Sequence, residues 1–224
     1  MAQEGASDLF LTVGAPPTLK RQGAFVPLPF DPLTPQQTRE AAYSVMRASQ
    51  IAEFEARMEC DLAYQTSPTE RFRVNVHQQR GQVGMVVRYV SPQIPSIDDL
   101  HLPSVLKQLA FLKNGLILVV GAAGSGKTTT LASMLDYRNE HTSGHILTVE
   151  DPIEYLHAHK KSLVTQREVG LDTLSYDEAL RHAMREAPDV IMVGEIRDSQ
   201  TMQHAMSYAD SGHLCVSTLH ANSA

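Results

Sequence analysis

The stretch Leu116-Ile-Leu-Val-Val-Gly-Ala-Ala-Gly-Ser-Gly-Lys-Thr128 decides the fold. Its first five residues, Leu116–Val120, are all apolar, which is typical of a strand buried on both faces. They lead into Gly121–Thr128, which matches the pattern G-x-x-x-x-G-K-[ST], and a helix is expected over Thr128–Tyr137. A strand, a glycine-rich loop and a helix in this order predict a parallel sheet covered by helices.

The same loop predicts a phosphate-binding site. Glycines let the backbone wrap a phosphate chain with its N–H groups pointing inward, and the start of the helix adds a partial positive charge. Lys127 would reach the β and γ phosphates, and the Thr128 hydroxyl would ligate Mg²⁺. ATP and Mg²⁺ are therefore the expected cofactors, and the expected nucleotide-binding residues are Gly121, Ala122, Ala123, Gly124, Ser125, Gly126, Lys127, Thr128 and Thr129.

Acidic residues follow two further apolar segments, residues 145–149 and 190–193: Glu150, Asp151 and Glu154 after the first, and Glu195 after the second. Ligands of open parallel sheets bind at the carboxyl ends of the strands, so these acids are expected to face the nucleotide. Glu195 is the expected metal ligand because it follows the most apolar segment. Among the three earlier acids, one is expected to activate water, whereas any single one could instead cap a turn.

His220 ends the apolar segment 214–219 and leaves two interpretations open. It either contacts the γ phosphate or the attacking water, or it is structural or merely exposed. The chain has ten histidines, but none has the spacing H-E-x-x-H, so we expect no zinc site.

The chain is expected to contain two domains, with residues 1–90 forming a mixed α/β unit, 91–102 a linker, and 103–224 the unit with the glycine-rich loop. Residues 18–28 predict a hairpin around Gly23. A helix is expected to begin at Thr34, because Thr34 and Gln37 have the spacing of a capping box and Pro35 suits the first helical position.

The segment Arg71–His77 alternates strictly, with three apolar residues on one face and Arg71, Arg73, Asn75 and His77 on the other. One interpretation is a half-buried strand with a solvated polar face. The other is a basic face presented to an anion or to a neighbouring subunit.

Composition excludes several classes of protein. Of 224 residues, 42% are hydrophobic and 20% charged, which is ordinary for a globular chain and unlike a disordered one. With two cysteines, Cys60 and Cys215, the chain is not a disulfide scaffold. The net charge of −6 argues against nucleic acid as a partner. No apolar stretch approaches the ~20 residues that a membrane helix needs, so a cytoplasmic location is expected.

Four blocks, in this order, resemble the type II/IV secretion ATPase superfamily: the Walker A loop Gly121–Thr128, the Asp box Thr148–Glu154, the Walker B block Pro188–Arg197 and the His box Gly212–His220. Within it, the chain is most similar to the PilT/PilU subgroup of type IV pilus retraction ATPases. Ala6–Leu9, Gly14–Pro17 and Arg71–Val74 match that subgroup, and Val164–Asp172 and His213–Cys215 are closer to PilU.

The resemblance implies an α/β fold with a PAS-like α+β domain followed by a RecA-like P-loop NTPase domain, and ATP bound between the two. It implies that Glu154 is the catalytic glutamate, Glu195 the Walker B acid and His220 the residue near the γ phosphate. Arg73 and Arg88 would reach the γ phosphate from the first domain, with Arg80 as a third choice. Phe10 and Asn114 depart from the subgroup, which often has His and Arg there.

The resemblance also implies an ATP-hydrolysing motor that retracts type IV pili and drives twitching motility. The implied partners are a homo-hexamer, a paralogous pilus ATPase and an inner-membrane pilus platform protein, with no nucleic acid and a peripheral location at the inner membrane. The alternatives are a pilus-assembly or secretion ATPase, or an accessory subunit that binds nucleotide without hydrolysing it. A DNA-handling RecA-like protein is a further class, which the net charge disfavours.

In the family, more strands and helices follow the His box, whereas this chain stops at Ala224. The resemblance therefore implies that the RecA-like domain is C-terminally truncated. We expect such a chain to carry the catalytic residues but to hydrolyse ATP poorly and to form no stable hexamer alone.

Overall fold

The computed structural model describes residues 1, 4–67, 70–90 and 93–220. Its contacts divide the chain into two compact units, Met1–Ser91 and Pro92–Ala224. Two parts of the sequence predictions lie outside the described residues: the start of the linker at Ser91–Pro92 and the chain end Ala221–Ala224.

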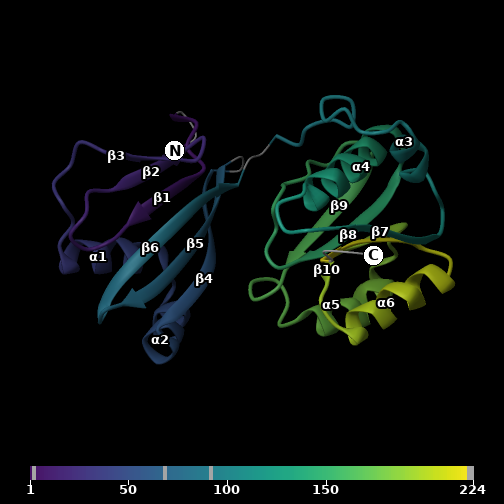
Figure 1. Ribbon diagram of the computed structural model, residues 1–224. Helices are drawn as coiled ribbons and strands as arrows, with labels where there is room; N and C mark the ends of the chain where they lie inside the picture. The colour runs from purple at the N-terminus through teal and green to yellow at the C-terminus, as the bar shows by residue number, and fades with distance from the viewer. Residues whose placement is uncertain (2–3, 68–69, 91–92, 221–224) are drawn as a thin grey trace. The chain divides into compact units, whose positions relative to one another are not determined.

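The first unit is an antiparallel sheet with two helices on one face (Figure 1). The sheet has the order β3-β2-β1-β6-β5-β4, with bounds β1 Asp8–Leu11, β2 Thr18–Arg21, β3 Ala24–Pro27, β4 Glu59–Ser67, β5 Glu70–Gln79 and β6 Gln82–Val90. The helices are α1 Pro35–Val45 and α2 Ala48–Arg57. Ala42 and Phe54 of the helices pack on Val74 and Val76 of β5, which confirms the predicted apolar face of that strand. The hairpin predicted around Gly23 is confirmed as β2–β3.

The beginning of α1 follows the predicted capping box. The Gln37 N–H donates to Thr34 Oγ1 at 3.3 Å, and the Thr34 N–H donates to Gln37 Oε1 at 2.9 Å. Two N–H groups that the helix itself cannot pair are thereby satisfied.

The second unit contains the predicted parallel sheet, which is confirmed with the order β7-β11-β10-β8-β9. Its strands are β7 Gly115–Gly121, β8 Gly144–Glu150, β9 Ser162–Glu168, β10 Val190–Ile196 and β11 Leu214–His220. One face is covered by α3 Val105–Leu109 and α4 Lys127–His141, and the other by α5 Tyr176–Ala183 and α6 Ser199–Asp210 (Figure 1).

Alternate strand residues fill two hydrophobic cores, one on each face of this sheet. Ile146 packs in the core under α4, and its neighbour Leu147 packs against α5 and α6; Val190 and Ile191 divide in the same way. Because successive side chains of a strand point to opposite faces, both faces must be apolar. This explains why the central strands are continuous apolar runs in the sequence.

Two local predictions differ from the structure. The helix expected over Thr128–Tyr137 begins at Lys127 and continues to His141. The predicted linker, 91–102, includes residues that pack in the second unit. Ile97 is 1% exposed in the core under α4, and the Pro95 carbonyl accepts a hydrogen bond from Ser133 Oγ at 2.7 Å.

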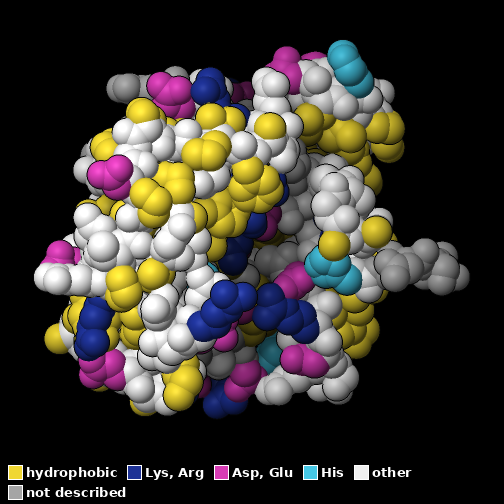
Figure 2. Space-filling view, turned by 60° about the vertical axis from the view of Figure 1, so that its left-hand side comes forward, with side chains coloured by type: hydrophobic (Ala, Val, Ile, Leu, Met, Phe, Trp, Pro, Cys, Tyr) yellow, Lys and Arg dark blue, Asp and Glu magenta, His cyan; other side chains and the backbone are white. Residues whose placement is uncertain are grey.

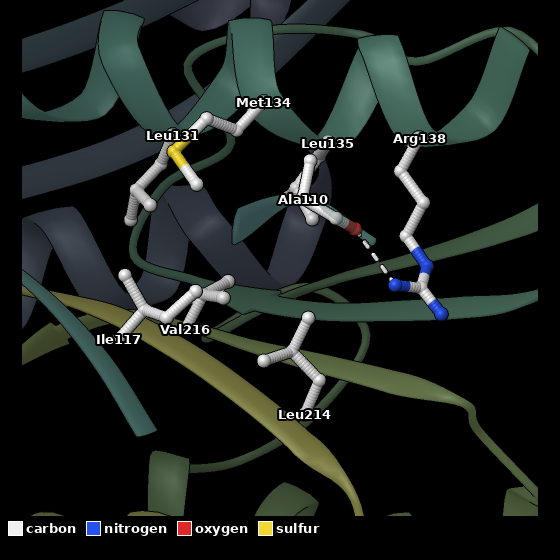
Figure 3. A pocket seen from close by; sticks show the side chains of 8 residues that line it. All are labelled: Ala110, Ile117, Leu131, Met134, Leu135, Arg138, Leu214 and Val216. Atoms are coloured by element: carbon white, nitrogen blue, oxygen red, sulfur yellow. Dashed lines mark hydrogen bonds between the residues drawn. The ribbon is translucent and has the colours of Figure 1, made fainter. Parts of the chain in front are cut away.

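A small apolar pocket lies between α4 and the strands β7 and β11 (Figure 3). It is lined by Ala110, Ile117, Leu131, Met134, Leu135, Arg138, Leu214 and Val216. Arg138 Nη1 closes one end by donating to the Ala110 carbonyl at 2.7 Å. The free space is about 10 Å³, at the lower limit for one water molecule. It is therefore a packing gap of the core and not a ligand site.

Candidate functional site

The glycine-rich loop connects β7 to α4 at the carboxyl edge of the parallel sheet. Gly124 and Gly126 have φ angles of +74° and +89°, which a residue with a side chain rarely adopts. Gly121 approaches Ser125 so closely that an added Cβ would lie 2.8 Å from Ser125 Oγ. The backbone conformation of the loop therefore needs glycine at Gly124 and Gly126, whereas a side chain at Gly121 would have to displace the Ser125 hydroxyl.

Lys127 is the clearest sign of an anion site. Its side chain is folded into the loop, where Nζ donates to the Ala122 carbonyl at 2.8 Å, and the residue is 6% exposed. Among the described residues, no carboxylate forms an ion pair with it; its other polar neighbour is His220 Nδ1 at 3.4 Å. A buried cation without a counter-ion is costly unless an anion binds there. A phosphate group fits this requirement.

Glu195 and His220 lie within hydrogen-bond distance of each other, beside Lys127 at the same edge of the sheet. His220 Nε2 lies 3.0 Å from Glu195 Oε2. The β10–β11 register shifts between Val193 and Ile196, so β10 has one extra residue at Gly194–Glu195. Such a bulge re-aims a side chain, and here it accompanies the contact of Glu195 with the end of β11. The structure thus brings Lys127, His220 and Glu195 together.

Arg197 extends this network to the loop after β8. Its guanidinium binds the Glu195 carboxylate and lies 3.1 Å from Asp151 Oδ2. Burial alone would lower the pKa of Arg197, but the two carboxylates outweigh burial and raise it. From the sequence, Arg197 was only the last residue of the Walker B block and had no role of its own. The signal that could have found it is its position two residues after an acid at the carboxyl end of a strand.

Glu150 and Glu154 lie in opposite environments. Glu150 is 5% exposed, and its Oε1 accepts hydrogen bonds from the Thr148 hydroxyl at 2.6 Å and from Gln166 Nε2 at 3.1 Å. Glu154 is exposed, and its carboxylate has no hydrogen bond or ion pair within the described part of the chain. Of these two acids, Glu154 is the one whose carboxylate is free to meet a ligand.

Thr128 and Thr129 follow Lys127 in the first turn of α4, and both are partly buried. Thr129 Oγ1 lies 3.0 Å from the hydroxyl of Tyr155. A Thr hydroxyl and a Glu carboxylate, as in Thr128 and Glu195, suit Mg²⁺, which uses few protein ligands and keeps several waters. The described residues contain no group of three or more His, Cys, Asp or Glu that could hold a metal by themselves.

Arg73 and Arg88 belong to the first unit, where they are direct cross-strand partners on β5 and β6. Arg88 Nε donates to Asp8 Oδ1 at 2.7 Å, and Asp8 is buried. Two like charges directly opposite each other are unfavourable in a sheet. Arg80 lies in the β5–β6 turn with a φ of +52°. Of the predicted polar face, Arg71 is buried instead of solvated.

Charges of both signs are mixed at the surface. Figure 2 shows a face on which Lys and Arg side chains lie next to Asp and Glu, with His among them. This face has no extended field of a single sign. No helix in the described ranges is long and apolar enough to cross a membrane.

A parallel sheet with a glycine-rich loop and a buried lysine at its carboxyl edge defines the class of P-loop nucleotide-binding proteins. Residues 60–224 match the model of the family described as Type II/IV secretion system protein. The chain belongs to this family.

Two curated proteins of Pseudomonas aeruginosa are similar to the whole chain. The Type IV pilus ATPase PilU is 50% identical over 224 residues, and the chain covers 59% of its length. The Type IV pilus retractation ATPase PilT is 44% identical over 223 residues, with 65% of its length covered. The chain thus spans about three fifths of the length of these relatives.

Two solved structures are also similar. The crystal structure of the pilus retraction motor PilT with bound ADP matches with a TM-score of 0.94 and 48% sequence identity. The match covers 100% of this chain and 65% of the PilT chain. The structure of the ATPase DotB of Legionella pneumophila matches with a TM-score of 0.84 and 26% sequence identity, over 99% of this chain and 63% of the DotB chain. These likenesses confirm the predicted family and α/β fold class.

Proposed function

We propose that the chain is the nucleotide-binding part of an ATP-hydrolysing motor that powers type IV pilus retraction. The buried Lys127, which lacks a counter-ion among the described residues, is the observation that carries the nucleotide site. The names of the full-length relatives, a pilus ATPase and a pilus retraction motor, support the biological role.

Each residue of the site has a role in this proposal. Residues Gly121–Gly126 and Lys127 bind the β and γ phosphates, because backbone N–H groups and an ammonium are phosphate donors. Thr128 and Glu195 hold Mg²⁺, which neutralises the phosphate charge when bound. Since Glu195 is paired with Arg197 and His220, it must exchange these partners when it takes up the metal.

Hydrolysis requires a base and further cations. Glu154 removes the proton of the attacking water, which its exposed carboxylate can accept. His220, between Lys127 and Glu195, contacts the γ phosphate. Arg73 and Arg88 of the first unit stabilise the charge that develops on that phosphate.

The working form is proposed to be a homo-hexamer on the cytoplasmic face of the inner membrane, held there by the pilus platform protein. A paralogous pilus ATPase is a second proposed partner. Movement between the two units during turnover would supply the mechanical work.

Deletion of the gene in its host tests the direction of force. Loss of twitching with an excess of surface pili is the result expected for a retraction motor. Loss of the pili themselves would contradict retraction and point to an assembly or secretion ATPase.

Complementation with Glu154→Gln then tests hydrolysis. The variant keeps the shape of the side chain but cannot take a proton, so twitching should stay absent. Restored motility would indicate an accessory subunit that binds nucleotide without hydrolysing it. Glu140→Gln, an exposed acid of α4, is the matched control and should restore motility.

A further inference from the structure

We propose that Tyr155 is a positioning residue of the phosphate site, which orients the Thr129 hydroxyl toward the nucleotide. This inference rests on the proposed nucleotide binding. Its starting point is the distance of 3.0 Å between Thr129 Oγ1 and the Tyr155 hydroxyl oxygen. Thr129 lies in the first turn of α4, two residues after Lys127, and Tyr155 directly follows Glu154. The contact therefore joins the helix of the phosphate loop to the segment that carries the proposed base.

The hydrogen-bonding capacity of the two hydroxyls gives the contact a direction. A hydroxyl has one hydrogen to donate and two lone pairs that accept. Without ligand, either hydroxyl can be the donor. A phosphate oxygen only accepts, so a Thr129 that donates its hydrogen to phosphate can only accept from Tyr155. The result is a relay in which Tyr155 donates to Thr129 and Thr129 donates to the phosphate, and each bond polarises the other.

The backbone around Tyr155 is held firmly enough for this role. Gln166 of β9 donates from Nε2 to the Tyr155 carbonyl at 2.9 Å and to Glu150 Oε1 at 3.1 Å. Its Oε1 accepts the His157 N–H at 2.8 Å. Gln166 thus uses both ends of its amide to fix residues 155–157 against the ends of β8 and β9.

The same segment is also tied to α4 further along the helix. Lys160 Nζ lies 2.8 Å from Asp136 Oδ2, and Asn139 Nδ2 donates to the Ala158 carbonyl at 2.7 Å. Asn139 is fully buried. Loss of the Tyr155 hydroxyl alone should therefore leave the segment in place and remove only the bond to Thr129.

A double-mutant cycle on the full 224-residue chain tests the inference. Binding of Mg²⁺ with ADP and with a non-hydrolysable ATP analogue is measured by calorimetry for the wild type, Tyr155→Phe, Thr129→Val and the double variant. We expect Tyr155→Phe to weaken binding about three- to tenfold, the range expected for one hydrogen bond. In the Thr129→Val background, the same change should have no further effect, because the hydroxyl it acts through is gone.

Two further variants separate this role from a general structural one. In Thr129→Ser, which keeps the hydroxyl, the effect of Tyr155→Phe should return. Tyr137→Phe removes a hydroxyl from the same helix as Thr129 and should bind like the wild type. Unchanged binding in Tyr155→Phe, or an equal loss in the Thr129→Val background, would overturn the inference alone. A wild-type chain that binds no nucleotide would overturn the proposed function and this inference together.

Discussion

Glu150, the last residue of β8, and Glu154, in the loop that follows, are four positions apart, yet their surroundings separate a structural acid from a reactive one. Burial raises the pKa of the Glu150 carboxyl, although hydrogen bonds from Thr148 and Gln166 oppose the shift. Its contacts fix the start of the segment that presents Glu154. The sequence could predict acids at this edge of the sheet, but it left their roles open because burial depends on residues distant in the chain.

The raised pKa of Glu150 predicts a pH dependence of stability. The folded chain holds the Glu150 proton more tightly than the unfolded chain, whose carboxyl has a pKa near 4.5. The contribution of this group to the free energy of unfolding is therefore greatest at acid pH, and it declines as the pH rises from 4.5 through the folded pKa. Glu150→Gln has no carboxyl at this position, so its free energy of unfolding does not decline with pH on that account. The free energy of unfolding of the variant minus that of the wild type should therefore increase from pH 5 to pH 8.

Urea denaturation at pH 5, 6, 7 and 8 measures this difference. A Glu150→Gln difference that stays constant from pH 5 to pH 8 would mean that the Glu150 carboxyl titrates alike in both states.

At the scale of elements, a local signal predicted where α1 begins. The capping box of α1 is such a signal, since Thr34 and Gln37 satisfy each other's backbone N–H groups within four residues. Thr34→Ala should lower the free energy of unfolding by about 1 kcal/mol, the usual value of an N-cap. Ser44→Ala on the exposed side of the same helix should change it by less than about 0.5 kcal/mol.

Chemical denaturation followed by circular dichroism measures both variants. If Thr34→Ala and Ser44→Ala had equal free energies of unfolding, the Thr34 cap would make no measurable contribution to the stability of the first unit.

Two elements were not predicted from the sequence: the strand Ser162–Glu168, which is β9, and the helix Tyr176–Ala183, which is α5. For α5 a local signal was present, because the Ser175 side chain caps the helix by accepting the Glu178 N–H at 3.1 Å. The strand β9 has two adjacent apolar residues, Leu163 and Val164, followed by four polar ones, so neither a strand alternation nor a buried apolar run marks it. It lies at the sheet edge, where it pairs with β8 alone among the described strands. The bulge of β10 was also missed, because the register between two strands is set by their packing and not by either segment alone.

For the whole molecule, chain topology explains why the site residues of the second unit could be predicted together. Parallel strands place all their carboxyl ends at one edge, so Lys127 after β7, Glu195 in β10 and His220 at the end of β11 meet there although Lys127 and His220 are 93 positions apart. Arg73 and Arg88 could be selected only through the family resemblance, since they belong to the other unit. Their part in hydrolysis is a proposal.

Calorimetric titration of the 224-residue chain with Mg²⁺ and ADP tests whether Lys127 binds a nucleotide. We expect saturable binding of one nucleotide per chain. Lys127→Ala should weaken binding by about a hundredfold, because a charge-assisted contact to phosphate is lost. Lys161→Ala, at an exposed lysine, should bind like the wild type. If no saturable binding were measured, or if Lys127→Ala bound as tightly as the wild type, Lys127 would not form a nucleotide site.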